Sequence, residues 1–496
     1  MKRVILDGNS LTLEQLRAVA CDGAEVELSK QAMDEVRKAR EIVLELANSE
    51  KQIYGLNTGV GANKDNRVTE EEFHRFNERI LFSHAVALPP YADTKTVRAT
   101  MLCRLNSMMT GLSGVSPEIP ELLRDMLNCG VHPRIPQRGS VGMADLGSMA
   151  YVGLALIGKG TVELHGLEMP ARTALAQCAL KPVSLGPKDG LPLVSNNSLA
   201  LAKAALLYGE IEDAVCMSEA VYALCLEAQE YNPMFLDRRM LRRRPFTGSE
   251  KSLEHICACL QGSSFWNNGV ETLYGALSFK SSPAIYGTMR DALESVKPLL
   301  LRHLNAAEDC PIVLIPEREM ISADNFIITG LAVEFEKLGI MLAHLSGLIC
   351  NRILRMDQEA FSGLPRFLRP ADDVIGYATI QKTISALDSE IQLLAAPVSF
   401  RYLPTSNDSE DHGCNTPLVM QKTEQILDLL YYLIGIEAMH GAQAADLKRR
   451  PDGEGTRKVY DALRSAVPFL EEDDRDLGED MRAAHDLVQQ KRFLVE

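Results

Sequence analysis

A glycine-rich loop places a phenol and a lysine close together in the chain. Residues 54–61 contain Tyr54 and three glycines, and Lys64 follows in the same loop. The glycines give the backbone unusual freedom, so this loop is expected to be mobile. A phenol titrates near about 10 and needs a cationic neighbour to remove a proton near neutral pH. Lys64 is a candidate for that cation, and a solvated surface lysine is the alternative.

A second polar loop, residues 403–413, contains three adjacent groups that could bind a metal ion. Glu410 and Asp411 precede His412 directly. Zinc sites usually combine such ligands with a second group at a fixed helical spacing, and no such group is apparent. The loop is therefore not predicted to be a metal site.

A lysine also interrupts an apolar helical pattern. Lys382 lies within residues 380–387, where Ile380, Ile384 and Leu387 recur at helical spacing. A cation in such a pattern costs free energy unless it faces a partner. Lys382 is therefore expected to meet a partner group.

Helices must position these residues, because helical periodicity dominates the chain. An apolar stripe recurs every three or four residues along one predicted helix, at Leu331, Phe335, Leu338, Leu342, Leu345 and Ile349. Residues 199–215 and 426–440 show similar patterns. Strand signals are short and lie at 4–6, 24–28 and 161–166, the last as half of a hairpin, and Ser29 is a predicted helix cap. The pattern predicts a mainly α, long-helix bundle.

The composition is that of a folded protein. Lys and Arg number 52 against 67 Asp and Glu, which gives a net charge of −15, and 46% of residues are hydrophobic. These values exclude general disorder. The negative charge argues against a nucleic-acid partner, which attracts basic surfaces. No apolar run approaches about 18 residues, so no membrane span and no membrane partner are predicted. The first residues lack the apolar core of a signal peptide.

The cysteines point to a reducing compartment. Eleven cysteines are an odd number spread thinly over the chain, and most lie in apolar surroundings. Buried, reduced thiols are favoured over a metal site at Cys257 and Cys259, and a cytoplasmic location is expected.

Several motifs together resemble the histidine and aromatic amino-acid ammonia-lyase family. They occur in family order and span roughly residues 1–450: Tyr54-Gly55-Leu56-Asn57-Thr58-Gly59, Leu81-Phe82-Ser83-His84, Arg104-Leu105-Asn106-Ser107, Gly111-Leu112-Ser113-Gly114, Gly139-Ser140-Val141-Gly142, Asn325-Phe326, and Pro404-Thr405-Ser406 leading to Glu410-Asp411-His412.

The resemblance implies a mainly α bundle of the ammonia-lyase (fumarase/aspartase-like) type and a homotetramer whose active sites draw residues from three chains. We divide the chain into an N-terminal α region with short strands (1–110), a central long-helix bundle (111–470) and a C-terminal helical tail (471–496).

The chain departs from the family at its electrophile. In the family, Gly-Ser-Val-Gly precedes Ala-Ser-Gly-Asp-Leu, and the Ala-Ser-Gly cyclises into a 4-methylidene-imidazol-5-one. Here Gly142 is followed by Met143, Ala144 and Asp145, one residue fewer and without the serine. Ser140 and Ser148 lie out of register. No such cofactor and no metal are therefore expected.

This absence suggests a particular kind of substrate. The electrophile bonds an amine to make it a better leaving group. A trimethylammonium nitrogen has no lone pair for that bond, and it leaves unaided as trimethylamine. A family member without the electrophile is thus either inactive or acts on a quaternary amine, and the latter resembles the ergothionases, which convert ergothioneine to thiourocanate.

The resemblance assigns roles to the ionisable residues. Tyr54 matches the loop tyrosine, the expected base for the β-proton. Glu410 matches a glutamate near the substrate imidazole. Lys382 stands where histidine lyases have an uncharged residue, and with Glu410 it could bind and protonate a thioimidazole, making the ring an electron sink. Lys280 stands where the family has its carboxylate-binding arginine, without the bidentate fork.

The resemblance also assigns binding residues. His84 matches a histidine near the leaving amine, although a lone histidine is often a satisfied core residue. Asn196 or Asn197 is the candidate for the family asparagine, which Ser195 displaces in the simplest alignment. Asn325 and Phe326 form a further matching motif and are expected to contact the substrate.

The leading prediction is a cofactor-independent carbon–nitrogen lyase that removes trimethylamine from a histidine-type betaine, foremost ergothioneine. Another betaine such as trimethylhistidine is the close alternative. A non-catalytic relative that binds a ligand is a third possibility, which the retained Tyr54 and Glu410 disfavour. An ammonia-lyase with an electrophile formed from atypical residues is the least favoured alternative, because the serine is missing.

Overall fold

The computed structural model describes residues 3–61, 65–267, 275–322 and 325–495. The chain forms two compact units: residues 1–206, 297–334 and 397–420 make up the first, and residues 207–296, 335–396 and 421–496 make up the second. Each unit thus combines three separated stretches of the chain. The sequence had instead suggested three consecutive segments, 1–110, 111–470 and 471–496. Four of the five boundaries fall inside long helices, which have no compositional break to mark them, and the fifth follows the end of the helix Ile380–Leu394.

The first unit combines helices with short strand pairs. Its elements are β1 (Arg3–Leu6), α1 (Leu13–Ala20), β2 (Glu25–Leu28), α2 (Lys30–Ala47), α3 (Phe73–His84), β3 (Leu88–Tyr91), α4 (Thr94–Met108), α5 (Glu118–Cys129), β4 (Val131–Pro133), β5 (Pro136–Arg138), α6 (Leu146–Leu156), β6 (Thr161–Leu164), β7 (Leu167–Pro170), α7 (Ala171–Gln177), α8 (Gly190–Val194), β8 (Ile312–Leu314) and β9 (Glu319–Ile321).

The strands of this unit form small, largely antiparallel sheets of two or three strands. β1 and β2 pair in parallel, β3 pairs with β5, β4, β6 and β7 form one three-stranded sheet, and β8 pairs with β9. The predicted hairpin is confirmed, because β6 and β7 pair from Thr161–Pro170 to Leu164–Leu167. The predicted cap is confirmed too, since the Ser29 side chain accepts a hydrogen bond from the Ala32 N–H at 3.4 Å.

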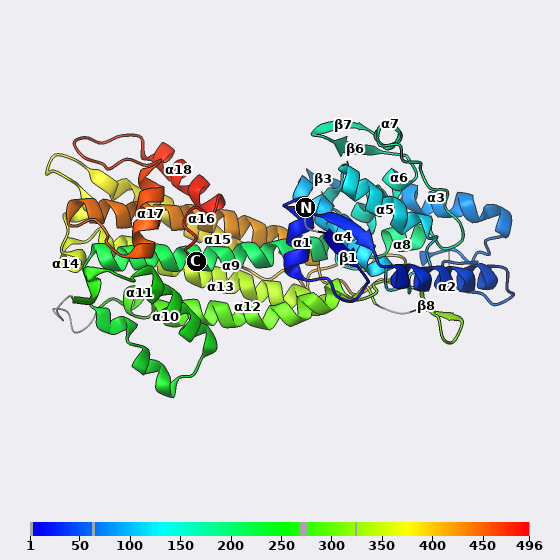
Figure 1. Cartoon of the computed structure of the whole chain (residues 1–496), viewed down its shortest axis with the longest axis horizontal. Coiled ribbons are helices and arrows are strands. Elements are labelled where there is room, and N and C mark those ends of the chain that lie inside the picture. Colours follow the sequence, from blue (N-terminus) through cyan, green and yellow to red (C-terminus); the bar gives the residue numbers. More distant parts are fainter. Residues whose placement is uncertain (1–2, 62–64, 268–274, 323–324, 496) are drawn as a thin grey trace. The chain divides into compact units, whose positions relative to one another are not determined.

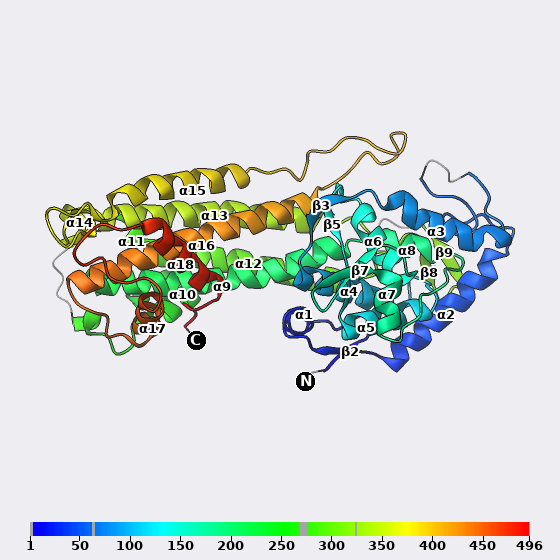
Figure 2. The same ribbon diagram turned by 90° about the horizontal axis from the view of Figure 1, so that it is seen from above.

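Four long helices carry the chain across the boundaries between the units: α9 (Ser198–Ala228), α12 (Ser282–Leu304), α13 (Thr329–Met356) and α16 (Thr416–Leu447). The second unit adds α10 (Thr247–Cys259), α11 (Leu277–Lys280), α14 (Glu359–Ser362), α15 (Ile380–Leu394), α17 (Glu454–Arg464) and α18 (Leu477–Gln489). Within it the long helices run side by side and nearly parallel (Figures 1 and 2). The mainly α bundle predicted from periodicity is confirmed.

α13 confirms the predicted apolar stripe. Leu331, Phe335, Leu338, Leu342, Leu345 and Ile349 are all buried. By length and composition α13 is also apolar enough to cross a membrane, and 56% of its most apolar stretch is buried inside the chain. A core helix of a folded bundle has the same properties.

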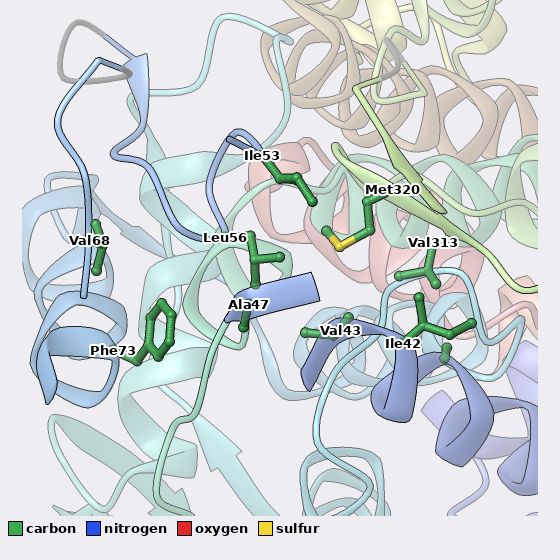
Figure 3. Close-up of a cluster of buried hydrophobic side chains, with 10 residues drawn as sticks. Ile42, Val43, Ala47, Ile53, Leu56, Val68, Phe73, Val313 and Met320 are labelled. Atoms are coloured by element: carbon green, nitrogen blue, oxygen red, sulfur yellow. The ribbon is translucent and has the colours of Figure 1, made fainter. Parts of the chain in front are cut away.

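A hydrophobic cluster in the first unit anchors the glycine-rich loop (Figure 3). Ile53 and Leu56 of the loop are buried there beside residues of α2, such as Ile42 and Val43, and Met320 of β9. Burying large apolar side chains contributes about 1.5–3 kcal/mol each. The residues on either side of Tyr54, Ile53 and Leu56, are therefore fixed in a hydrophobic core, although the loop is rich in glycine.

Candidate active site

Tyr54 is half-buried in the first unit, on the turn that Ile53 and Leu56 anchor. Its hydroxyl accepts a hydrogen bond from the Gly61 N–H at 3.0 Å. Burial raises the pKa of Tyr54, the Gly61 N–H lowers it, and the nearby Cys310 and Glu410 raise it further. In one chain the net shift of the Tyr54 pKa is thus upward, away from neutrality. Lys64, the predicted source of positive charge, lies outside the described residues.

Two features fix the turn that carries Tyr54. Gly55 has a φ of +67°, and a Cβ there would lie 2.5 Å from Leu191 Cδ2 of α8. Any other residue would strain the backbone at this positive φ and would have to displace the Leu191 side chain. The Asn57 side chain accepts from the Ile53 N–H at 2.8 Å and donates to the Lys51 carbonyl at 2.9 Å. Both contacts stabilise the turn around the phenol.

Glu410 belongs to a tight loop of the same unit. Thr405 and Glu410 exchange two backbone hydrogen bonds, of 2.9 and 3.2 Å, and the Thr405 hydroxyl donates to the Glu410 carboxylate at 2.8 Å. The Glu410 side chain is partly exposed, and its charge reaches Tyr54. The structure thus places the predicted base and the predicted acid within electrostatic reach of each other.

His412 contacts neighbouring hydroxyl groups. Its ring nitrogens lie 3.4 Å from the Thr329 hydroxyl and 3.5 Å from the Tyr402 hydroxyl. Across the described residues, no group of three or more potential metal ligands is found. The donor set around Glu410 therefore gives no indication of a metal site.

The segment 139–146 stands where the family forms its electrophile, and it packs tightly. Gly142 has a φ of +80°, and a Cβ there would lie 2.8 Å from both the Asn415 nitrogen and Cys414 Sγ. The Val141 carbonyl accepts hydrogen bonds from the N–H groups of Cys414 and Asn415. The segment is therefore held against the start of α16.

The residues of this segment do not fit the electrophile. Met143 pairs with Ile327 in an isolated bridge, and Ala144 follows with a φ of +63°. The Ser140 hydroxyl donates to the Ala144 carbonyl at 3.0 Å and to Asp145 at 3.1 Å. Ser140 is thus a local hydrogen-bond donor, and no serine stands between Ala144 and a glycine.

Asn196 and Asn197 are both fully buried at the start of α9. The Asn196 amide donates to the Pro192 carbonyl, and its oxygen accepts from the Ser198 N–H. The Asn197 amide donates to the Phe326 carbonyl at 2.7 Å. In a single chain these amides thus hold backbone, and their predicted contact with a substrate stays a prediction.

Phe326 and Asn325 lie on the segment that Asn197 holds, with Phe326 half-buried and Asn325 exposed. His84 ends α3, where its Nδ1 lies 2.8 Å from the Ile80 carbonyl and 3.1 Å from the Ser83 hydroxyl. The His84 carbonyl lies 3.5 Å from a Cβ built at Gly147 of α6. The first unit therefore brings His84 close to the segment 139–146.

Sequence reasoning missed a buried acid beside these asparagines. Glu308 accepts a hydrogen bond from the Asn197 backbone N–H at 2.8 Å, and burial raises the pKa of Glu308 to about 8. Burial likewise raises the pKa of Asp145 to about 6. The sequence gives no sign that Glu308 and Asp145 are unusual, because only the fold shows that water is excluded around them.

Lys280 and Lys382 belong to the second unit. Lys280 ends α11, is half-buried, and its ammonium lies 5.9 Å from the centre of the Phe235 ring. Lys382 lies in the first turn of α15 and is exposed to solvent in one chain. An exposed ammonium is hydrated, so the partner expected for Lys382 stays a prediction.

A wide groove of about 1990 Å³ borders both lysine-bearing helices of the second unit. Leu277 and Ser278 of α11 line it, together with His344 and Arg355 of α13 and Gln392 of α15. The volume is larger than the 300–1,000 Å³ that small-molecule sites usually enclose. Its size suits a chain segment better than a single amino-acid derivative.

Comparison with known proteins identifies the family. The aromatic amino acid lyase family matches residues 11–465. Histidine ammonia-lyase of Chloroflexus aurantiacus is 35% identical over 490 residues, covering 95% of this chain and 94% of that protein. A crystal structure of ergothionase from Treponema denticola, in complex with desmethyl-ergothioneine sulfonic acid, has a TM-score of 0.97 and 39% identity over 100% of both chains.

More distant members of the same group share the fold. Histidine ammonia-lyase of Trypanosoma cruzi superimposes with a TM-score of 0.89 at 26% identity, over 99% of this chain and 97% of that one. The match over nearly the whole length confirms the resemblance seen in the motifs and the ammonia-lyase type of fold. The chain belongs to the aromatic amino acid lyase family.

Proposed function

We propose that this chain is a trimethylamine-lyase that acts on a histidine-type betaine, with ergothioneine as the foremost substrate and thiourocanate as its product. One observation carries the proposal: Met143-Ala144-Asp145 stands where the family's serine is required, while Tyr54 and Glu410 are retained within electrostatic reach of each other. The likeness to an ergothionase structure supports the same substrate class.

The chemistry balances without an electrophile. A base takes the β-proton, the electrons of that C–H bond form the new double bond, and the Cα–N bond breaks with its electrons on nitrogen. The leaving group is neutral trimethylamine, so nothing has to bond the nitrogen beforehand. The main barrier is removal of a weakly acidic β-proton, which an electron-accepting ring lowers.

The proposed roles follow this requirement. Tyr54 takes the β-proton as a phenolate, while Glu410 and Lys382 bind the thioimidazole and stabilise the charge that develops in it. Because burial raises the pKa of Tyr54 in one chain, and Cys310 and Glu410 raise it further, the phenolate needs positive charge from elsewhere. Lys64 or a lysine of another subunit supplies it.

The assembled pocket is proposed to form between chains of a homotetramer. Lys280 and Lys382 belong to a different unit from Tyr54 and Glu410, and the groove of the second unit is large enough to receive part of another subunit. Lys280 holds the substrate carboxylate, while His84, Asn325 and Phe326 contact the remainder of the substrate.

The enzyme is expected to work in the cytoplasm. The sequence has 11 cysteines, and all of them are free thiols in this structure. Disulfides are rare in a reducing compartment, so this pattern favours a cytoplasmic location.

An ammonia-lyase is the second candidate, because relatives at 32–35% identity bear the name histidine ammonia-lyase. That activity requires activation of a primary amine, and the segment 143–145 lacks the serine for it. The two functions therefore differ in a simple way, namely in whether a primary or a quaternary amine is released.

Incubation with ergothioneine tests the proposal directly. The absorbance of the conjugated product and the release of trimethylamine should rise together, and L-histidine under the same conditions should yield no ammonia. Tyr54→Phe should abolish the reaction. The native enzyme should also be tested on trimethylhistidine, the alternative substrate. Deamination of histidine would establish the ammonia-lyase instead, and inertness towards all three compounds would overturn the proposal.

A further inference from the structure

Lys280 lies on a helix too short to satisfy its own carbonyl groups. α11 has four residues, Leu277–Lys280, and the last carbonyls of any helix lack intrahelical partners. Pro283, four residues after Phe279, has no N–H to donate to the Phe279 carbonyl. Phe279 is itself buried, and its carbonyl shares the N–H of Ser281 with the Leu277 carbonyl, so a further donor is favourable.

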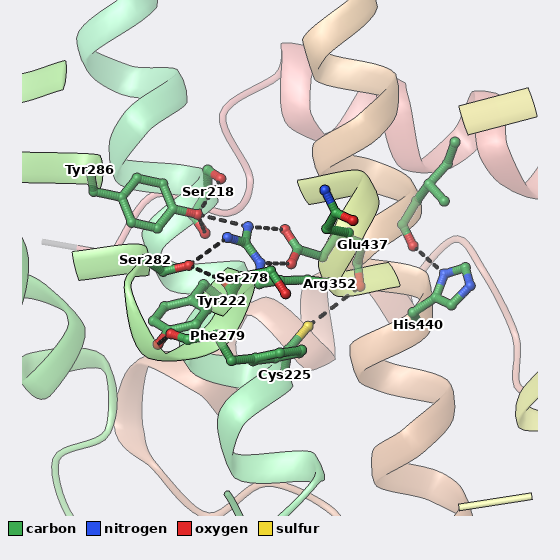
Figure 4. A network of polar contacts seen from close by, with 12 residues as sticks. Ser218, Tyr222, Cys225, Ser278, Phe279, Ser282, Tyr286, Arg352, Glu437 and His440 are labelled. Atoms are coloured by element: carbon green, nitrogen blue, oxygen red, sulfur yellow. Dashed lines mark hydrogen bonds and ion pairs between the residues drawn. The ribbon is translucent and has the colours of Figure 1, made fainter. Parts of the chain in front are cut away.

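Two hydroxyl groups supply donors to this helix. The Tyr222 hydroxyl of α9 donates to the Phe279 carbonyl at 2.7 Å. The Ser282 hydroxyl donates to the Ser278 carbonyl at 2.6 Å. Both carbonyls belong to the residues just before Lys280, and Figure 4 shows the two hydroxyls meeting the helix within one network. The backbone that carries the ammonium is thus held by side chains of neighbouring helices.

Arg352 of α13 organises these donors. Its guanidinium donates to the Ser282 hydroxyl at 2.8 Å and to the Tyr286 hydroxyl at 2.9 Å. It also donates to both carboxylate oxygens of Glu437 on α16, one at 2.8 Å. The guanidinium also lies over the Tyr222 ring, 5.1 Å from its centre, in a cation–π contact.

The charges in this network are fully buried. Arg352 and Glu437 each have 0% exposed side chain. Removing two charges from water is costly, and the pair recovers that cost only with good geometry and further hydrogen bonds. Stability alone is therefore a weak reason for placing an ion pair here. A network with fixed directions does define one position for the helix that it contacts.

We infer that Tyr222, Ser282, Arg352 and Glu437 form a positioning network for Lys280, an inference that rests on the proposed contact between Lys280 and the substrate carboxylate. The network acts through the carbonyls of Ser278 and Phe279. It fixes where the ammonium of Lys280 meets the carboxylate, which compensates for the missing bidentate fork of an arginine.

Tyr222→Phe is the main test, because it removes one hydroxyl and keeps the ring. With ergothioneine as substrate, KM should rise about 5- to 10-fold, the range expected for loss of one hydrogen bond, while kcat stays within about twofold. The carboxylate keeps its charge throughout the reaction, so its contact affects binding more than turnover. Ser282→Ala should act in the same direction and provides a second variant if Tyr222→Phe fails to fold.

Tyr431→Phe is the matched control. Tyr431 is also a buried tyrosine of the second unit, but its hydroxyl donates to Glu210 at 3.1 Å, and in the described part of the chain no hydrogen bond joins it to α11. The Tyr431→Phe variant should therefore have the same KM for ergothioneine as the native enzyme. A rise in KM for Tyr431→Phe equal to that for Tyr222→Phe would show a general effect of buried hydroxyls and overturn the inference.

A double-mutant cycle separates positioning from a general structural role. In a Lys280→Met background, Tyr222→Phe should change KM no further, because the group that it positions is gone. An equal rise in KM in both backgrounds would overturn the inference, as would an unchanged KM for Tyr222→Phe and Ser282→Ala in the native background.

The proposed function can fail separately. If the native protein does not consume ergothioneine, the substrate proposal is wrong. If it does so and Lys280→Met leaves KM unchanged, the carboxylate contact is wrong and the positioning inference falls with it. If Lys280→Met raises KM and Tyr222→Phe does not, only the positioning inference falls.

Discussion

The side-chain amide of Asn197 donates a 2.7 Å hydrogen bond to the backbone carbonyl of Phe326. The two residues are 129 positions apart, and this bond connects the start of α9 to the segment before α13. Ile327, the next residue, bridges to Met143. Asn197 thus fixes the position of a segment that contacts the altered electrophile region.

Replacement of Asn197 by alanine should destabilise the first unit by about 1–3 kcal/mol, because the Phe326 carbonyl loses its donor. Urea unfolding measures the loss, and amide exchange at residues 326–328 should become faster. Asn9→Ala is the control, since Asn9 donates to the Asp7 carbonyl from an exposed position. Equal stability of the two variants would show that the Asn197 bond contributes little.

Residues 139–146 should remain an ordinary peptide, because no Ala-Ser-Gly is present to cyclise. Intact-mass measurement of the purified chain should give the mass calculated from the sequence. A mass lower by two waters, located to this segment by peptide mapping, would contradict the prediction and restore the ammonia-lyase alternative.

The active protein should be a tetramer, because the proposed site residues of one chain are divided between two units. Size-exclusion chromatography with light scattering, performed on active fractions, should give about four times the 54.7 kDa mass of the chain. A monomer with full activity would contradict a pocket shared between subunits.

Mixed tetramers provide the sharper test. Tyr54→Phe and Lys382→Met chains, each inactive alone, should regain partial activity when they are dissociated and reassembled together. Some sites then receive an intact Tyr54 from one chain and an intact Lys382 from another. Complete lack of recovery would place both residues of a site in the same chain.

Lys382→Met should reduce turnover by at least about 100-fold and affect binding much less, because its charge is needed mainly as the β-proton leaves. Lys280→Met should show the opposite division, with a higher KM and little change in kcat. Steady-state kinetics on ergothioneine distinguishes the two. Near-normal turnover of Lys382→Met on every trimethylammonium substrate tried would end the ring-as-electron-sink mechanism.

Glu308 should make stability depend on pH. Burial raises its folded-state pKa to about 8, from an ordinary value near 4.5, with Arg104 opposing the shift and Asp145 adding to it. Between these values the folded state binds the proton and the unfolded state does not, so this contribution to stability is lost as the pH rises from about 4.5 to 8.

The comparison uses Glu308→Gln, which cannot titrate. Between pH 5.5 and 7.5 the native protein should lose up to about 3 kcal/mol of unfolding free energy relative to this variant, at about 1.4 kcal/mol per pH unit. Urea unfolding at both pH values measures the difference. Glu317→Gln, at an exposed position, should follow the native profile, and parallel profiles for Glu308→Gln would show that Glu308 ionises normally.

The sequence predicted the elements whose patterns are local. The α13 stripe, the cap at Ser29 and the β6–β7 hairpin depend on neighbours within a few residues, and each is present. The pairs β3–β5 and β8–β9 were not predicted. β3 contains Pro89 and Pro90, which normally argue against a strand, and β8 and β9 have only three residues each.

The candidate site was predictable only in part. Motifs identified Tyr54 and Glu410, and the structure brings them within electrostatic reach. The burial of Glu308 could not be read from Ala-Glu-Asp, because its surroundings come from residues far away in the sequence, such as Asn197 and Arg104. Conversely, Lys382 lies within an apolar sequence pattern and yet is exposed in one chain. A local pattern does not show whether another part of the protein covers a residue.

The contacts around Gly142 bear on whether the residue that this segment lacks could be inserted. A Cβ at this position would clash with Asn415 and Cys414, and the Val141 carbonyl and Met143 are both bonded to other segments. The missing serine cannot be restored by one substitution, because the segment is also one residue short. An added residue would have to displace the start of α16 or break the bridge to Ile327. Introducing an Ala-Ser-Gly here therefore requires an insertion together with compensating changes in the two distant segments that these residues contact, around Ile327 and Cys414, and no single substitution achieves it.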